Sequence, residues 1–78
     1  MKVTKYFQFR RLLNDRKPIQ DKWIEEVIKN PSERKVQEDG RIRMWGTVSQ
    51  AGNRYLRVVL LEDGETVHNA FFDHSHKE

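Results

Sequence analysis

Residues 54–72 read RYLRVVLLEDGETVHNAFF, and this stretch decides the fold. Branched and aromatic side chains fill both of its ends, which is typical of β-strands. Asp63 and Gly64 stand between the two ends, and an Asp-Gly pair flanked by strand-like residues is a strong signal for a two-residue hairpin turn. The stretch therefore predicts two antiparallel strands, over residues 54–61 and 66–72.

Upstream of this hairpin, residues 41–49 alternate in polarity, and residues 50–53 read as a four-residue turn. Residues 33–38 are a short polar run and a candidate edge strand. With these turns, Trp45 is expected to pair with Val58, and Val58 with Asn69. One face would then hold Trp45, Leu56, Val58, Leu60, Val67 and Phe71 with Asn69 as a misfit, and the other Met44, Gly46, Val48, Tyr55, Arg57, Val59, His68, Ala70 and Phe72.

The N-terminal part of the chain predicts helix. Trp23, Ile24, Val27 and Ile28 follow the spacing of one buried helical stripe, and Asn30-Pro31 ends the run, so we expect a helix over residues 20–29 with Trp23 as a core anchor. The spacing in residues 3–13 suits both strand and helix, and we expect a short strand or coil followed by a helical turn near residues 9–13.

These elements predict an α+β fold: a three- to four-stranded antiparallel meander with one or two N-terminal helices packed on one face. A chain of 78 residues has room for one small core, so we expect a single domain over 1–78 with its core at about 6–73 and a mobile tail at 74–78.

Composition excludes several classes of protein. The chain has no cysteine, so it forms no disulfides and no thiolate metal site. Its apolar runs, such as residues 58–61, are far shorter than the roughly 18 residues of a membrane span. The N-terminal residues lack the apolar segment of a signal peptide, and no helix looks basic and amphipathic enough for a membrane surface. We expect a cytoplasmic protein with no membrane partner.

The formal net charge is only +3, but the charge is unevenly distributed. Residues 41–61 carry four arginines and no acid, whereas residues 62–78 carry one basic residue and five acids. The basic block could attract phosphates on one face, or opposite blocks could simply pair across a small fold.

The face opposite the helix holds the candidate site. The expected register sets Arg57 between Gly46 and Ala70, with Tyr55 and His68 as neighbours, which suits phosphate and base recognition. The alternative is that Arg57 pairs with an acid and the aromatic residues cover a minor core. The candidate binding residues are Arg41, Arg43, Arg54, Arg57, Tyr55 and His68.

Several strings carry a family resemblance: W-I-x-x-V-I-x-N-P at 23–31, Q-E-D-G-R-I-R-x-W at 37–45, Y-L-R-V-V at 55–59 and D-G-E-T-V-H-N-A-F-F-D at 63–73. Over residues 19–73 the chain resembles a family of small bacterial domains of unknown function, which is similar in layout to the BrnT and RelE/ParE-like toxin fold. The family pattern places an arginine after Asp73, where this chain has His74.

The resemblance implies a compact sheet whose uncovered side binds ribosome-associated messenger RNA, and a toxin normally has an antitoxin partner. Arg57, Tyr55 and His68 could take the basic and tyrosine roles of toxin cleavage. Three hypotheses follow: a module that binds RNA or a protein partner, a metal-independent ribonuclease with Arg57, His68 and Tyr55 as candidate catalytic residues, and a homodimer formed through residues 33–38. His68, Asp73, His74 and His76 do not complete a metal site, so we expect no metal and no cofactor.

Overall fold

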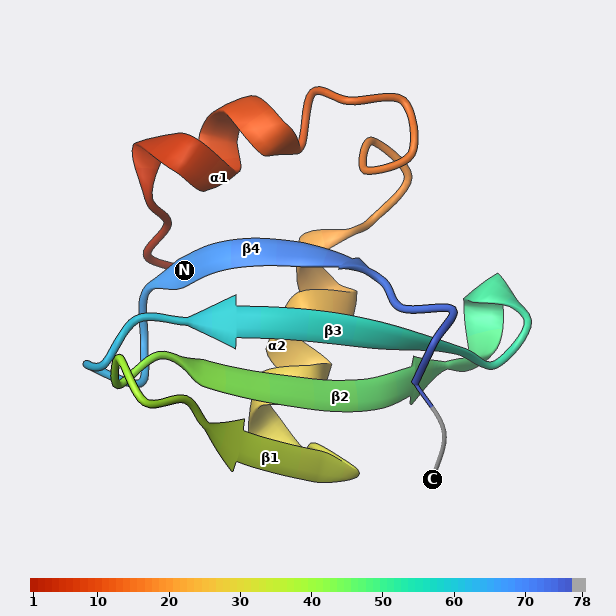
Figure 1. Cartoon of the computed structure of the whole chain (residues 1–78). Coiled ribbons are helices and arrows are strands. Elements are labelled where there is room, and N and C mark those ends of the chain that lie inside the picture. The colour runs from red at the N-terminus through yellow and green to blue at the C-terminus, as the bar shows by residue number, and fades with distance from the viewer. Residues whose placement is uncertain (77–78) are drawn as a thin grey trace.

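The computed structural model describes residues 1–76 and forms two helices and one four-stranded sheet (Figure 1). The strands are antiparallel and lie in the order β1-β2-β3-β4, so the predicted α+β meander is confirmed. In this part of the chain neither helix is long and apolar enough to cross a membrane. The elements are α1 (Lys5–Arg10), α2 (Asp21–Lys29), β1 (Glu33–Val36), β2 (Ile42–Val48), a 3-10 turn (Ser49–Ala51), β3 (Arg54–Leu60) and β4 (Val67–Phe72).

Helix α2 covers one face of the sheet and lies behind it in Figure 1. Its stripe is the predicted one: Ile24 and Val27 are buried, while Trp23 and Ile28 are partly buried against the same core. Gly46 of β2 lets the helix approach closely, because a Cβ at that position would lie 3.1 Å from Val27 Cγ2. Burial of this stripe holds the helix on the sheet.

Helix α1 lies along the β4 edge of the sheet (Figure 1). Val3 forms a single parallel bridge with Val67, and the Thr4 hydroxyl then caps α1 by accepting a hydrogen bond from Phe7 N at 3.1 Å. Because of this cap the helix starts at residue 5, four residues before the expected helical turn at residues 9–13. Hydrogen bonds from Leu12 N to Phe9 O and from Leu13 N to Arg10 O continue the turns through that stretch. Phe7 reaches the core, and within residues 1–76 the outer edge of β1 has no strand beside it.

The predicted pairing of β2 with β3 is wrong by one residue. The connection spans residues 49–53, because a 3-10 turn is followed by Gly52 and Asn53 with φ of 74° and 61°. The loop is thus one residue longer than the expected four-residue turn, and Trp45 pairs with Arg57 instead of Val58. A shift of one residue exchanges the faces of the whole strand.

The predicted pairing of β3 with β4 holds only next to the hairpin turn. Leu60 pairs with Val67 as expected, but a bulge follows, and Val58 pairs with Ala70 instead of Asn69. The extra residue at the bulge is His68, since Val67 and Asn69 face consecutive residues of β3. Beyond the bulge, Ala70 is buried in the core and Phe71 lies on the opposite face.

The two shifts correct the predicted faces. The faces of β3 are as predicted, with Leu56, Val58 and Leu60 buried. On β2, however, Met44, Gly46 and Val48 lie toward α2 and Trp45 lies on the other face, which reverses the prediction. The core under α2 contains Phe7, Ile19, Ile24, Val27, Ile42, Met44, Val48, Leu56, Val58, Leu60, Val67 and Ala70.

Candidate functional site: an arginine and aromatic array

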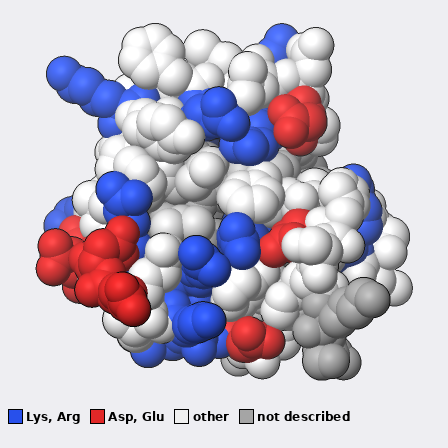
Figure 2. All heavy atoms as spheres, viewed as in Figure 1, with Lys and Arg blue, Asp and Glu red and all other residues white. Residues whose placement is uncertain are grey.

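The face of the sheet turned away from α2 has no helix over it, and we call it the open face. Strand alternation places a mixture of cations and aromatic side chains there. Figure 2, drawn from this side, shows Lys and Arg side chains gathered over the middle and lower part of the face. From β1 to β4 the paired residues of the open face are Glu33, Lys35, Arg43, Trp45, Thr47, Tyr55, Arg57, Val59, Asn69 and Phe71.

Arg57 lies at the centre of the open face with an aromatic neighbour on each side. Trp45 pairs with it from β2 and Phe71 from β4. Its guanidinium carbon is 5.3 Å from the Trp45 ring centroid and 5.2 Å from the Phe71 ring centroid. Both distances are in the range of cation–π contacts. We call Trp45, Arg57, Phe71 and the next residue in line, Arg16, the arginine–aromatic row.

Arg16 reaches the open face from the segment that joins the two helices. Its guanidinium carbon is 5.0 Å from the Phe71 ring centroid, and its Nη1 donates a hydrogen bond to Asn69 Oδ1 at 3.0 Å. The same amide oxygen accepts from Ala70 N at 3.0 Å. Asn69 is therefore no misfit in the core, because the bulge turns it outward to bind Arg16.

Asp73, directly after β4, holds one end of the row. Its Oδ2 accepts a hydrogen bond from Trp45 Nε1 at 3.1 Å and lies 3.3 Å from Arg57 Nε. Its Oδ1 accepts from Ser75 N at 3.1 Å and from Ser75 Oγ at 2.7 Å. Burial alone would raise the pKa of Asp73, but the hydrogen bonds from Ser75 and Trp45 and the charge of Arg57 together lower it to about 2.

The Arg57 guanidinium is fixed on one side and available on the other. Its Nε is buried and faces the Asp73 carboxylate, while 24% of the side chain is exposed. Within residues 1–76, Nη1 and Nη2 of Arg57 donate no hydrogen bond to the protein. The pairing of Arg57 with an acid, which the sequence left as an alternative, is therefore present. It orients the guanidinium without using all of its donors.

The residues after Asp73 cross one end of the open face (Figure 1). The His76 ring stacks on Trp45, with ring centroids 4.7 Å apart and planes 13° apart, and it meets Tyr55 edge-on at 4.7 Å. His76 Nε2 also lies 3.6 Å from Glu33 Oε1. Trp45 is only 4% exposed in this arrangement. Of the predicted mobile tail, residues 77–78 lie outside the described part of the chain.

The six predicted binding residues do not form one patch. Arg43, Tyr55 and Arg57 share the open face. Arg54 lies on the other face of β3, where its guanidinium carbon is 4.0 Å from the Phe72 ring centroid and its Nε donates to Ala51 O. Arg41 lies before β2, with its Nε 3.9 Å from Asp39 Oδ2.

His68 lies at the bulge of β4 and is directed toward α1. Its Nδ1 is hydrogen-bonded to Thr4 Oγ1 at 3.2 Å, and its ring stacks on Tyr6 at 4.8 Å. Burial, with a smaller contribution from the charge of Arg41, lowers the pKa of His68 below 6.5. The expected neighbourhood of Arg57 and His68 is therefore wrong, and the imidazole that does lie on the open face is His76, which stacks on Trp45.

Sequence reasoning missed four residues of the site: Arg16, Trp45, Phe71 and Asp73. The expected register assigned Trp45 and Phe71 to the core, and both pairing shifts were needed to bring them beside Arg57. Asp73 belonged to the family-like string but had no assigned role. Arg16 lies in an irregular segment, and we find no sequence signal that would place it on Phe71.

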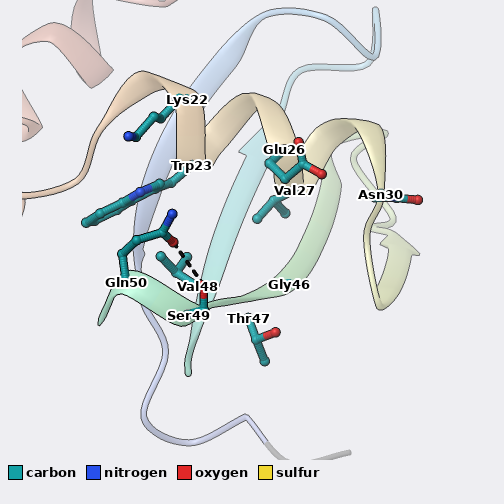
Figure 3. A pocket seen from close by; sticks show the side chains of 10 residues that line it. All are labelled: Lys22, Trp23, Glu26, Val27, Asn30, Gly46, Thr47, Val48, Ser49 and Gln50. Atoms are coloured by element: carbon teal, nitrogen blue, oxygen red, sulfur yellow. Dashed lines mark hydrogen bonds between the residues drawn. The ribbon is translucent and has the colours of Figure 1, made fainter. Parts of the chain in front are cut away.

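Two hollows of the described surface have nearly equal volumes. One, of about 520 Å³, is lined by residues 35–39 and Arg43. The other, of about 510 Å³, lies on the opposite side of the sheet between α2 and the end of β2. Figure 3 shows Trp23 and Gln50 on one side of this second hollow and Glu26 and Val27 on the other. Residues 1–76 contain no group of three or more His, Asp or Glu side chains placed to hold a metal ion.

No family model, curated protein or solved structure gives a significant match to this chain. Function is therefore inferred from the chemistry of the open face alone.

Proposed function

We propose that the protein is a small binding module of toxin-like fold that binds single-stranded RNA through its open face. The observation that carries this proposal is the arginine–aromatic row, because it places two guanidinium groups beside aromatic rings on the open face. Of these rings, Phe71 is partly exposed and Trp45 lies under His76. Single strands are bound in this way in general: cations follow the phosphates, and bases stack on aromatic rings or guanidinium planes. The absence of cysteine suits the reducing cytoplasm, where we place the protein.

Four cations can serve as phosphate contacts. Arg57 and Arg16 belong to the row. Arg43 and Lys35 are cross-strand neighbours on β2 and β1, and they lie on the same face beside the row. Arg43 and Lys35 make no ion pair with any of residues 1–76, so their charges are available for an anionic ligand. The Arg57 guanidinium also has a fixed orientation, because its Nε faces the Asp73 carboxylate, so its Nη1 and Nη2 donors are directed toward a ligand.

Binding is favoured over cleavage because the predicted general base, His68, does not lie beside Arg57. His68, the base of the ribonuclease hypothesis, is hydrogen-bonded to Thr4 and stacked on Tyr6. The carboxylate that does contact Arg57 is Asp73, whose pKa of about 2 makes it a weak base at neutral pH. Of the predicted catalytic residues, Arg57 and Tyr55 share the open face without His68, while the groups needed for binding lie together.

Fluorescence anisotropy with a labelled oligouridine tests the proposal. Four phosphate contacts predict that log K falls with log salt at a slope of about −3, since each contact to a single strand contributes about −0.7. Arg57→Ala should weaken binding and reduce the slope by about one contact. Arg54→Ala is the matched control, because it removes the same charge from the same strand on the opposite face.

Equal effects of the two substitutions would show that only net charge attracts the RNA. No binding by the wild-type protein at micromolar concentration would refute the proposal. Loss of intact RNA during the titration would favour the ribonuclease hypothesis instead.

A further inference from the structure

The two most exposed large apolar side chains of the described residues, Phe9 and Leu12, lie with the exposed Tyr6 and Leu13 on α1 and the turn that follows it. Phe9 is 72% exposed, Leu12 65%, Tyr6 46% and Leu13 42%. Outside this group, only Met1 and Val36 are exposed large apolar residues within the described chain. We call Tyr6, Phe9, Leu12 and Leu13 the α1 patch.

Tyr6 stacks on His68, but Phe9, Leu12 and Leu13 are not part of the core. α1 is held by Phe7 in the core and by the Thr4 cap, and Phe7 is its only buried residue. Phe9 and Leu12 keep most of their surface in water. A cluster of apolar side chains that the fold leaves in solvent indicates an interaction surface.

Cations surround the α1 patch. Residues 1–19 carry six basic side chains and one acid. Arg11 is paired with Asp21 and Arg16 with Asp15, but Lys5 and Lys17 have no ion pair with any of residues 1–76. Figure 2 shows uncharged surface at the end of the molecule where α1 lies, with Lys and Arg side chains and one acidic group along its border. The occupant of the patch should therefore combine an apolar part with negative charge.

Charge and shape together select the occupant. A second copy of the chain would bring the same excess of positive charge to the contact. In Figure 1, α1 projects from the β4 edge of the sheet. A convex apolar group with a cationic border matches a deformable surface with anionic headgroups.

We infer that the α1 patch docks the protein on anionic lipid membranes, with Phe9 and Leu12 entering the boundary of the acyl chains and Lys5 and Lys17 at the headgroups. This contact is peripheral, because no helix of residues 1–76 can span a bilayer. It differs from the sequence-based expectation of no membrane partner, which used the sequence pattern of the helices and not their exposure. The inference does not depend on RNA binding.

Vesicle co-sedimentation of the full chain tests it, with phosphatidylcholine vesicles that contain or lack phosphatidylserine. We expect binding only with phosphatidylserine. The double variant Phe9→Ser/Leu12→Ser should bind at least about tenfold more weakly, because two apolar side chains no longer leave water. Lys5→Glu should weaken binding by about fivefold or more, since each cation near an anionic surface contributes roughly one such factor.

Matched controls distinguish binding by the α1 patch from non-specific hydrophobic binding and from an effect of net charge. Val36→Ser removes an apolar side chain that is 55% exposed on β1, and Lys29→Glu makes the same charge change at the end of α2. Both should bind vesicles nearly as well as the wild type. All the substituted residues are exposed, so circular dichroism should show an unchanged fold.

Three results would overturn the inference. They are the absence of vesicle binding, equal binding by the double variant and the wild type, and self-association that the double variant abolishes in light scattering. The last result would make the patch a contact between copies. RNA binding by the double variant should stay unchanged, so a failure here is distinguishable from a failure of the proposed function.

Discussion

Substitution of Asp73 by Asn should destabilise the protein in a pH-dependent way. The change keeps the size of the side chain and removes the charge that faces Arg57 and Trp45. The folded state lowers the pKa of Asp73 from 3.8 to about 2. This difference corresponds to about 2 kcal/mol of stability at neutral pH, because 1.36 kcal/mol accompanies each pKa unit. For a domain of this size, whose total stability is on the order of 5 kcal/mol, the loss is large.

The sign of the pH dependence follows from the direction of the shift. A carboxyl group whose pKa is lowered on folding stabilises the protein above its unfolded pKa and loses that contribution as the pH falls through the folded value. The difference between the wild type and Asp73→Asn should therefore be full at pH 7 and should fade between about pH 4 and pH 2.

Urea denaturation followed by tryptophan fluorescence measures this difference. With a slope of about 1 kcal/mol per M, the midpoint of Asp73→Asn at pH 7 should fall by about 2 M. Asp73→Ala should lose more, since Trp45 Nε1 is then left without an acceptor. Asp39→Asn is the control: Asp39 faces Arg41 at 3.9 Å on the exposed surface, and its loss should cost less than about 1 kcal/mol.

Equal midpoints for the wild type and Asp73→Asn at pH 7 would refute the reasoning. A difference that stayed constant from pH 7 to pH 2 would also refute it, because the loss would then not come from the charge.

Three other predictions concern two glycines, the stacking of His76 on Trp45 and the pKa of His68. Gly46→Ala should lower the free energy of unfolding by about 1–3 kcal/mol, because the added methyl group crowds against α2. Gly52→Ala has open space around it and should lower the free energy of unfolding by only about 1 kcal/mol, because Gly52 has a positive φ. Chemical denaturation of the two variants measures this difference. His76→Ala should uncover the Trp45 ring and raise acrylamide quenching of its fluorescence, and unchanged quenching would mean that the imidazole does not shield the indole. Because the pKa of His68 is lowered on folding, the unfolded chain binds a proton more readily, and the stability should fall as the pH drops through 6.5. NMR titration of the His68 imidazole should give a midpoint below 6.5. A midpoint above 6.5 would contradict the burial of the ring.

Local pattern was sufficient to predict the elements of the fold. The helical stripe around Ile24 and Val27, the Asp63-Gly64 hairpin and the alternation of β3 each depend on neighbours in the sequence. β3 was assigned to the correct faces because Leu56, Val58 and Leu60 occupy every second position, with Arg57 and Val59 between them. Such patterns are independent of what the strand pairs with.

The register between neighbouring strands could not be predicted from local pattern, because single residues in a loop or at a bulge determine it. The left-handed conformations at Gly52 and Asn53 lengthen one loop, and the bulge at His68 shifts the outer part of β4. Each of these features exchanges the faces of the residues beyond it. As a result, Arg57 was placed on the correct face with the wrong neighbours, and Trp45 and Phe71 were missed.

The two tryptophans allow the most direct test of the central claim, which is that the open face binds RNA. Trp45 lies on the open face, and Trp23 lies on α2 beside the hollow of the opposite face. Their indole Nε1–H signals can be followed in one NMR titration with oligouridine. We predict that the Trp45 signal shifts progressively while the Trp23 signal stays in place. A shift of the Trp23 signal alone, or of neither signal at saturating RNA, would contradict the claim.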